Sequence, residues 1–143
     1  MSTPLVSILI PFKNTANYLE DCLESILKQT FTSWEVLIVD DRSTDDSRII
    51  VQRYTDLDSR IHLLNNQGNG IIDALRTAYS HVKGTLITRM DSDDIMMENK
   101  LMKLQKSLQK YGRGYLATGK IRYFSKTGIG EGYKRYQDWL NTL

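Results

Sequence analysis

The sequence has one cysteine, two prolines and no apolar run long enough to cross a bilayer. The single cysteine, Cys22, excludes a disulfide within the chain and is typical of a reducing compartment. The first apolar run, residues 5–10, is short and has no basic segment before it, so we expect no signal peptide and a cytoplasmic protein. The net charge of +2 gives no reason to expect nucleic acid or an anionic membrane surface as a partner.

The length and composition are those of an ordinary soluble protein. A chain of 143 residues has the size of one domain and can bury a core. Its share of hydrophobic residues, 41%, and of charged residues, 25%, is typical of globular domains. Residues 1–143 are therefore expected to form a single domain.

Apolar runs rich in β-branched residues alternate with segments in which apolar residues recur at helical spacing. The runs predict buried strands at residues 5–10, 34–39, 60–64 and 85–88, and a fifth strand within 115–124. The spaced segments predict helices near residues 17–29, 44–54, 72–82 and 97–111, and a weaker one at 133–143. Strands that alternate with helices predict an α/β fold, Rossmann-like, with a mostly parallel sheet and helices on both faces.

Several boundary residues are also predicted. Pro11 is expected to end the first strand, because proline cannot donate a hydrogen bond to a neighbouring strand. Thr44 or Asp45 is expected to cap the second helix. Gly84 and Gly112 are expected to end the third and fourth helices.

Three carboxylates follow the predicted strand at residues 85–88. Asp91 and Asp93 are two positions apart, so in an extended segment their side chains point to the same side, and Asp94 is next to them. Ligands bind at the carboxyl edge of open α/β sheets, and paired carboxylates suit Mg²⁺ or Mn²⁺. The cluster is therefore a candidate metal site. The alternative is a solvated acidic turn that caps the next helix.

A second strand also ends in acids, at Asp40 and Asp41. Acidic ends of two strands at one edge favour a nucleotide site, in which one carboxylate accepts hydrogen bonds from a base or ribose and another holds a metal on the diphosphate. The alternative is that Asp40 or Asp41 only caps the following helix.

Other common sites are excluded by single positions. Gly68-Asn69-Gly70 begins like a dinucleotide fingerprint, but Asp73 stands where the third glycine belongs. No glycine-rich loop ends in Gly-Lys-Ser/Thr, which excludes a P-loop. The cluster at Asp91 has Met102 where a calcium-binding EF-hand needs glutamate. The only histidines, His62 and His81, are isolated in the sequence and suggest no catalytic base.

Taken together, these segments resemble the nucleotide-binding half of the family 2 glycosyltransferases, which are inverting enzymes with the GT-A fold. The segments that carry the resemblance are V-S-I-L-I-P-F-K-N at 6–14, Y-L-E-D-C-L-E-S-I-L-K-Q-T at 18–30, E-V-L-I-V-D-D-R-S-T-D at 35–45, Gly70 with Ala74, and K-G at 83–84 leading to D-S-D-D at 91–94. They cover residues 5 to 105 in the family's order. Three positions differ from the family's usual pattern, namely Lys13 in place of an aromatic, Arg42 in place of glycine and Arg76 in place of asparagine.

The resemblance implies roles for individual residues. The base would be bordered by Pro11, Phe12, Lys13 and Asn14, and a uracil-type base would be held by Asp41 with Asp40 beside it. Gly70 would belong to the same donor site. Asp91 and Asp93 would form the D-x-D element on the ribose and on Mn²⁺ or Mg²⁺, with Asp94 close by.

The resemblance also implies an activity, the transfer of a sugar from a UDP-sugar to a saccharide or lipid-linked acceptor. Family members continue well beyond this length, so the chain is expected to be a donor-binding half that ends before the acceptor part, binds donor without transferring sugar, and exposes apolar surface for self-association. The late acids Glu131 and Asp138 do not match the family's general base, which stays unassigned. The protein would be cytoplasmic or peripheral at the inner face of the membrane. Two alternatives remain open at this point, a metal-dependent nucleotidyltransferase and a nucleotide-sugar-binding domain without turnover.

Overall fold

The computed structural model describes residues 5–112, 114–125 and 127–142, and it divides into two compact units, residues 1–101 and 102–143. Among the described residues, the first unit contains a four-stranded parallel sheet in the order β3-β2-β1-β4. The strands are β1 (Val6–Phe12), β2 (Trp34–Asp40), β3 (Ile61–Asn65) and β4 (Leu86–Arg89). The predicted α/β fold with a parallel sheet is confirmed.

The two central strands are buried along their whole length, which explains their nearly continuous apolar sequences. β1 pairs with β2 from Val6↔Trp34 to Phe12↔Asp40. On its other side β1 pairs with β4 only as far as Leu9↔Arg89. Since all these strands run in one direction, the residues that follow β1, β2 and β4 come together at one edge of the sheet.

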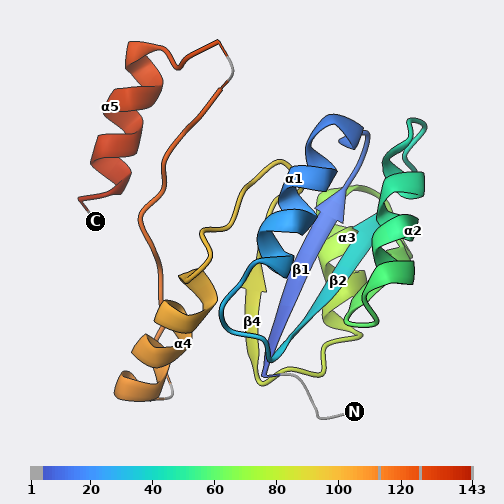
Figure 1. Cartoon of the computed structure of the whole chain (residues 1–143), viewed down its shortest axis with the longest axis horizontal. Coiled ribbons are helices and arrows are strands. Elements are labelled where there is room, and N and C mark those ends of the chain that lie inside the picture. The colour runs from blue at the N-terminus through green and yellow to red at the C-terminus, as the bar shows by residue number, and fades with distance from the viewer. Residues whose placement is uncertain (1–4, 113, 126, 143) are drawn as a thin grey trace. The chain divides into compact units, whose positions relative to one another are not determined.

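Helices cover both faces of the sheet, as predicted (Figure 1). On one face, α1 (Ala16–Leu27) and α2 (Ser47–Leu57) pack on the even-numbered residues of β1 and β2. On the other face, α3 (Gly70–Tyr79) places Ala74 and Ala78 against Leu9, Leu37 and Val39. The alternation of side chains along a strand thus gives each central strand two buried faces.

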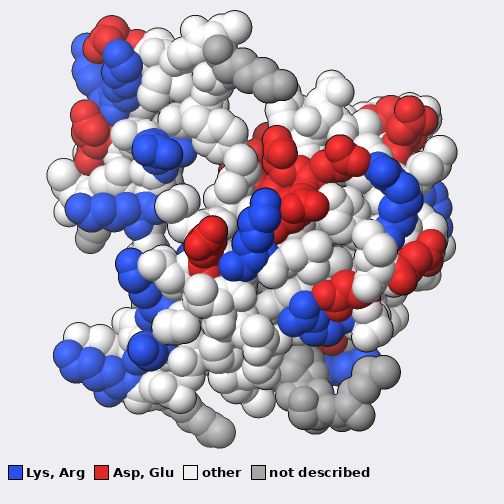
Figure 2. Space-filling model, in the orientation of Figure 1, with Lys and Arg blue, Asp and Glu red and all other residues white. Residues whose placement is uncertain are grey.

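Over α1 and α2, acidic and basic side chains lie next to one another (Figure 2). The ion pairs there include Arg53–Glu20 and Lys28–Glu24. This part of the surface is therefore mixed in charge. Among the described residues, no helix has the length and the apolar character needed to cross a membrane.

Pro11 does not end β1, which continues to Phe12. The carbonyl of Leu9 accepts a hydrogen bond from Met90, and that of Phe12 accepts one from Asp41. The backbone N–H and C=O groups of the odd-numbered residues of β1 therefore point toward β4, and those of the even-numbered residues point toward β2. The missing N–H of Pro11 therefore faces the side on which the pairing with β4 has already stopped. A proline costs little at such a position.

Two other boundaries also differ from the sequence predictions. α2 begins at Ser47, its N-cap is Asp46, and Asp45 instead accepts a hydrogen bond from the N–H of Ser47 at 3.0 Å. α3 ends at Tyr79, well before Gly84. Gly84 is needed for a different reason, since a Cβ there would lie 2.7 Å from the backbone nitrogen of Ser7 in β1.

α4 (Lys100–Tyr111) begins at the end of the first unit and continues into the second. Gly112 ends it as predicted, with φ of +81° and its N–H on the carbonyl of Leu108. The predicted final helix is present as α5 (Glu131–Leu140), although position 143 of that prediction lies outside the described residues.

The predicted strand within residues 115–124 is wrong, because this segment contains no strand in the structure. The N–H groups of Ile121 and Tyr123 donate to the side chains of Asn141 and Gln137, at 2.8 and 2.7 Å. Those side chains replace the neighbouring strand that a β-ladder would require. The expectation that residues 1–143 form one domain stays a prediction.

Candidate functional site

A cavity of about 270 Å³ lies at the carboxyl edge of the sheet, entirely within the first unit. It is lined by the last two residues of β1, by residues that follow β1, β2 and β4, and by one residue of α3: Pro11, Phe12, Lys13, Asp41, Ile71, Asp91, Ser92 and Asp93. The structure thus brings together six of the residues that the sequence singled out. Four others, Asn14, Asp40, Gly70 and Asp94, do not line this cavity.

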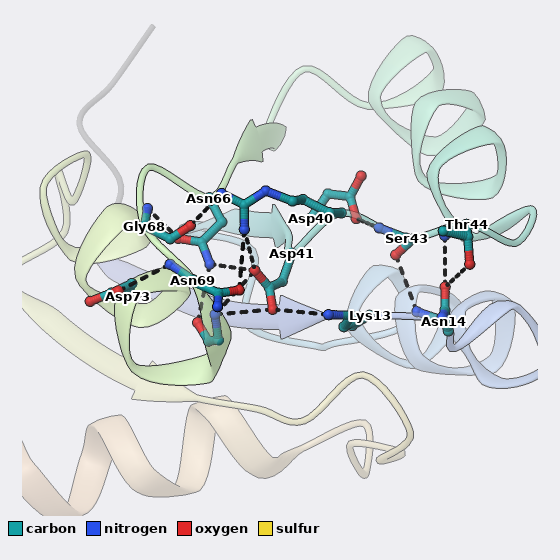
Figure 3. Close-up of polar contacts among 12 residues, drawn as sticks. Lys13, Asn14, Asp40, Asp41, Ser43, Thr44, Asn66, Gly68, Asn69 and Asp73 are labelled. Atoms are coloured by element: carbon teal, nitrogen blue, oxygen red, sulfur yellow. Dashed lines mark hydrogen bonds and ion pairs between the residues drawn. The ribbon is translucent and has the colours of Figure 1, made fainter.

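Asp41 is buried at the wall of the cavity and is held by the loop that follows β3 (Figure 3). Its Oδ1 accepts a hydrogen bond from Nδ2 of Asn66 at 2.7 Å, and its two oxygens lie 3.2 and 3.1 Å from the N–H of Gly70. Two cations are also near, Arg42 at 3.5 Å and Lys13 at 3.8 Å.

These contacts keep Asp41 ionised. Burial alone would raise the pKa of Asp41, but the hydrogen bonds from Asn66 and Gly70 and the charges of Lys13 and Arg42 outweigh it, so the pKa lies below its ordinary value. A carboxylate can accept about four hydrogen bonds. The N–H of Gly70 is shared by both oxygens, whereas Asn66 donates to Oδ1 alone, so Oδ2 has more capacity left for a ligand N–H.

Asp40 points away from Asp41, because successive residues of a strand alternate between the two faces. Its carboxylate is buried and accepts hydrogen bonds from the N–H of Ser43 at 2.8 Å and from Arg48 at 3.1 Å. Arg48 in turn donates to Asn65 at the end of β3, at 2.8 Å. In this structure Asp40 therefore fixes the turn after β2.

The loop after β1 and the loop after β2 are joined by hydrogen bonds (Figure 3). Asn14, with φ of +53°, donates its N–H to Ser43 at 3.1 Å and accepts the N–H of Thr44 at 2.8 Å. The N–H groups of Thr15 and Ala16, at the start of α1, donate to Ser47 and Asp45. Side chains of the second loop and of the first residue of α2 thus cap α1, and both loops are held in one arrangement beside the cavity.

The acidic cluster lies directly after β4. Arg89 binds Oδ1 of Asp91 with two nitrogens, at 3.1 and 2.7 Å. Burial, followed by the charges of Asp91 and Asp93, raises the pKa of Asp94. The charges of Asp91 and Asp93 thus disfavour the ionisation of Asp94, and a bound cation would relieve this repulsion.

Cys22 of α1 lies against the same cluster, with Sγ 3.8 Å from the backbone carbonyl of Asp91. Burial, and then the charges of the three aspartates, raises the pKa of the thiol to about 12. A neutral, buried thiol is a packing residue rather than a nucleophile.

The carboxylates have the chemistry that a hard divalent cation prefers. Among the residues that the structure describes, no group of three acids, cysteines or histidines is arranged to hold a metal by itself. Asp91 and Asp93, which both line the cavity, could supply two ligands. The other ligands would then come from water and from the substrate, as is usual for Mg²⁺ at phosphate groups.

Near the end of β3, sequence reasoning predicted Gly70 as part of the site but missed Asn66. Asn66 is buried and joins Asp41 to Gly70, with its Nδ2 on the carboxylate and on the carbonyl of Gly70 at 3.1 Å. Asp41 and Asp91 were selected because ligands bind at the carboxyl edge of such a sheet. The same reasoning would have selected Asn66, because Asn66 directly follows β3.

The comparison with protein families gives one match. The family described as "Glycosyl transferase family 2" matches residues 7–142, which is most of the chain.

Several curated relatives are named as glycosyltransferases. The chain is 41% identical over 102 residues, 71% of its length and 40% of the relative's, to "UDP-Glc:alpha-D-GlcNAc-diphosphoundecaprenol beta-1,3-glucosyltransferase WfgD" of Escherichia coli. The chain spans less than half the length of the curated relatives it matches first.

Two solved structures share the fold. The structure of S. aureus TarS 1-349 in complex with UDP-GlcNAc matches with a TM-score of 0.70 at 23% identity, over 81% of this chain and 37% of TarS. The mannosyltransferase PcManGT from Pyrobaculum calidifontis, in complex with GDP-Man and Mn²⁺, matches with a TM-score of 0.68 at 27% identity, over 75% and 33%.

Proposed function

Since the chain belongs to glycosyl transferase family 2, we propose that it forms the donor-binding part of an enzyme that transfers a sugar from a UDP-sugar to an acceptor. The observation that carries this proposal is the single cavity shared by Asp41, Asp91 and Asp93. It offers a buried carboxylate for a base and two further carboxylates for a metal on a diphosphate.

Asp41 is the residue that would read the base. Its ionised Oδ2 accepts the N3–H of uracil, and Lys13, which lines the same cavity, donates to a carbonyl beside that N–H. Guanine presents two neighbouring donors on its pairing edge, whereas Oδ1 is already engaged by Asn66 and Gly70. The arrangement therefore favours a base with one N–H between carbonyl groups, and WfgD, a relative, is named for a UDP-sugar.

Asp91 and Asp93 would hold Mn²⁺ or Mg²⁺ against the diphosphate. When bound, the metal supplies a positive charge that stabilises the nucleoside diphosphate as it leaves. Arg89 engages Oδ1 of Asp91, which leaves Oδ2 of Asp91 to bind the metal. The pairing at 2.7 Å holds this carboxylate in one orientation until the donor arrives.

The acceptor in this proposal is a saccharide or a lipid-linked saccharide, reached from the cytoplasmic side of a membrane during polysaccharide assembly. The relative WfgD is named for a diphosphoundecaprenol-linked acceptor. An acceptor hydroxyl, deprotonated by a carboxylate that is not yet assigned, would attack the anomeric carbon and invert it.

Calorimetric titration of the 143-residue protein with UDP, GDP, ADP and CDP tests the proposal. UDP should bind clearly with Mn²⁺ and much more weakly with a chelator. Asp41→Asn should reduce the preference for UDP over GDP, whereas Asp91→Asn should weaken binding of every nucleoside diphosphate alike. Asp56→Asn, on the exposed side of α2, is the matched control and should bind as the wild type does.

Equal UDP affinity with and without metal would remove the metal from the proposal. The same loss of base preference in both variants would show that the roles of Asp41 and Asp91 are divided wrongly. Absence of UDP binding under all conditions would refute the proposed donor site.

A further inference from the structure

Arg42 directly follows Asp41 and adopts a backbone conformation that arginine normally avoids. Its φ is +61°, in the left-handed region where a Cβ collides with the backbone and where glycine is preferred. Strain of this kind persists only where neighbouring contacts hold it in place. The contacts made by the Arg42 side chain therefore need an explanation.

Both hydrogen bonds of the Arg42 side chain lead to the loop at residues 66–70. Nη2 of Arg42 donates to the carbonyl of Gly68 at 2.7 Å, and Nη1 donates to Oδ1 of Asn69 at 3.3 Å. Nη1 also lies 3.5 Å from Oδ1 of Asp41. One guanidinium thus connects the turn after β2 with the loop after β3, passing beside the carboxylate that faces the cavity.

The same loop supplies the hydrogen bonds that orient Asp41, from Asn66 and from the N–H of Gly70. On its other side the loop is tied to α3, where Asp73 accepts the N–H of Asn69 at 3.0 Å and Thr77 accepts that of Gln67 at 3.1 Å. Arg42, in the turn after β2, thus holds Gly68 and Asn69, the middle of the loop.

We propose that Arg42 is a positioning residue for the donor site, a latch that holds residues 66–70 against Asp41 and so keeps Oδ2 directed into the cavity. This inference rests on the proposed function, because it assigns a base-reading role to Asp41. Arg42 itself does not line the cavity and acts through the loop.

Because the backbone of Arg42 is left-handed, substitutions at this position can distinguish a positioning role from a purely structural one. Glycine at position 42 would relieve the backbone strain and remove the latch together, so stability and binding should change in different directions. Alanine would keep the strain and remove the latch. Lysine would keep the charge, but its single ammonium cannot reproduce the two-nitrogen contact with Gly68 and Asn69.

The experiment compares wild type with Arg42→Gly, Arg42→Ala and Arg42→Lys by thermal unfolding and by titration with UDP and with uridine in the presence of Mn²⁺. Arg42→Gly should unfold at the same temperature as wild type or higher, yet bind UDP about fivefold more weakly or worse, the usual lower bound for coupling between two sites. Arg42→Ala should lose binding equally and unfold at a lower temperature. Arg42→Lys should recover only part of the affinity.

A comparison of uridine affinity with UDP affinity shows whether Arg42 acts through the loop or contacts the diphosphate directly. Loss of the latch should weaken both ligands by the same factor, because the base contact is what changes. A much larger loss for UDP than for uridine would show that Arg42 binds the diphosphate directly and would overturn the proposal. Wild-type affinity in Arg42→Gly would overturn it as well.

If the wild type binds neither UDP nor uridine, the proposed donor site is refuted, and the role of Arg42 must be tested without a ligand. In that case, hydrogen exchange of the amides of Asn69 and Gly70 in the ligand-free protein shows whether Arg42 holds the loop in place. Faster exchange in Arg42→Gly at unchanged global stability would support the latch, and unchanged exchange would refute it.

Discussion

Replacing Asp41 by asparagine tests whether this buried carboxylate holds the donor site together before any ligand binds. The substitution keeps the shape of the side chain but removes its charge. It also turns an NH₂ group toward Asn66 and Gly70, which are themselves donors. One oxygen remains to accept one of these bonds, so the structure predicts the loss of about one charge-assisted hydrogen bond.

A hydrogen bond to a charged group contributes about 1.5–3 kcal/mol, so Asp41→Asn should lower the free energy of unfolding by about 2 kcal/mol. In a domain of this size that corresponds to a fall of roughly 8 °C in the unfolding midpoint. Asp56→Asn, whose carboxylate accepts only an exposed hydrogen bond from Gln52, should change stability by less than about 0.5 kcal/mol.

The difference should depend on pH in a defined direction. The pKa of Asp41 is lower in the folded protein than its ordinary value. A group of this kind stabilises the fold above its unfolded pKa of about 3.9, and that stabilisation is lost as the pH falls through the folded pKa. The gap between wild type and Asp41→Asn should therefore be full at pH 7 and shrink as the pH falls below about 4, because the protonated acid resembles the amide.

Urea unfolding at pH 7 and at acidic pH, followed by circular dichroism, measures both effects. A variant as stable as the wild type at pH 7 would contradict the hydrogen-bonding assigned to Asp41. A stability gap that stays constant through the acidic range would contradict its ionised state.

Two further predictions concern close packing within the first unit. Gly84→Ala should lower the free energy of unfolding by about 1–3 kcal/mol, because its Cβ would meet the backbone of β1 at 2.7 Å. Gly119→Ala, with open space around it, is the control and should leave stability unchanged. Equal urea midpoints for the two variants would contradict the close packing at Gly84. Cys22, fully buried and with a thiol pKa of about 12, should resist iodoacetamide at pH 8 in the native protein and react fully in urea, and stoichiometric labelling under native conditions would contradict its position.

The central strands could be predicted because their burial is two-sided. Every residue of β1 and β2 is buried, so both read as nearly continuous apolar runs, and the acids that end β2 and follow β4 stand out against them. The alternation of strands and helices then places those acids at one edge. This reasoning identified Asp41, Asp91 and Asp93, which do line one cavity.

The different positions of Asp40 and Asp41 could not be predicted from the sequence. Alternation along a strand implies that they point to opposite faces, but both faces of this sheet are covered by helices. Only the structure shows that the turn after β2 uses Asp40, through Ser43 and Arg48.

The loop contacts of Asn66 and Arg42 were also beyond prediction from local pattern. They join residues 25 and 26 positions apart, between segments that carry no periodic signal. The strand expected within residues 115–124 failed for a related reason. A β-prone composition favours a strand only where a partner strand is present, and the N–H groups of this segment bond to side chains near α5 instead.

The central claim is that Asp91 and Asp93 hold a metal on a uridine diphosphate whose base lies against Asp41. Nuclear magnetic resonance of ¹⁵N-labelled protein with Mn²⁺ tests it most directly, because the paramagnetic ion broadens the amide signals nearest to it. With UDP present, broadening should be strongest at Asp91 to Asp93, and the amide of Gly70 should shift with UDP but not with inorganic diphosphate. Broadening centred elsewhere, or broadening at these residues together with no response of Gly70 to UDP, would contradict the claim.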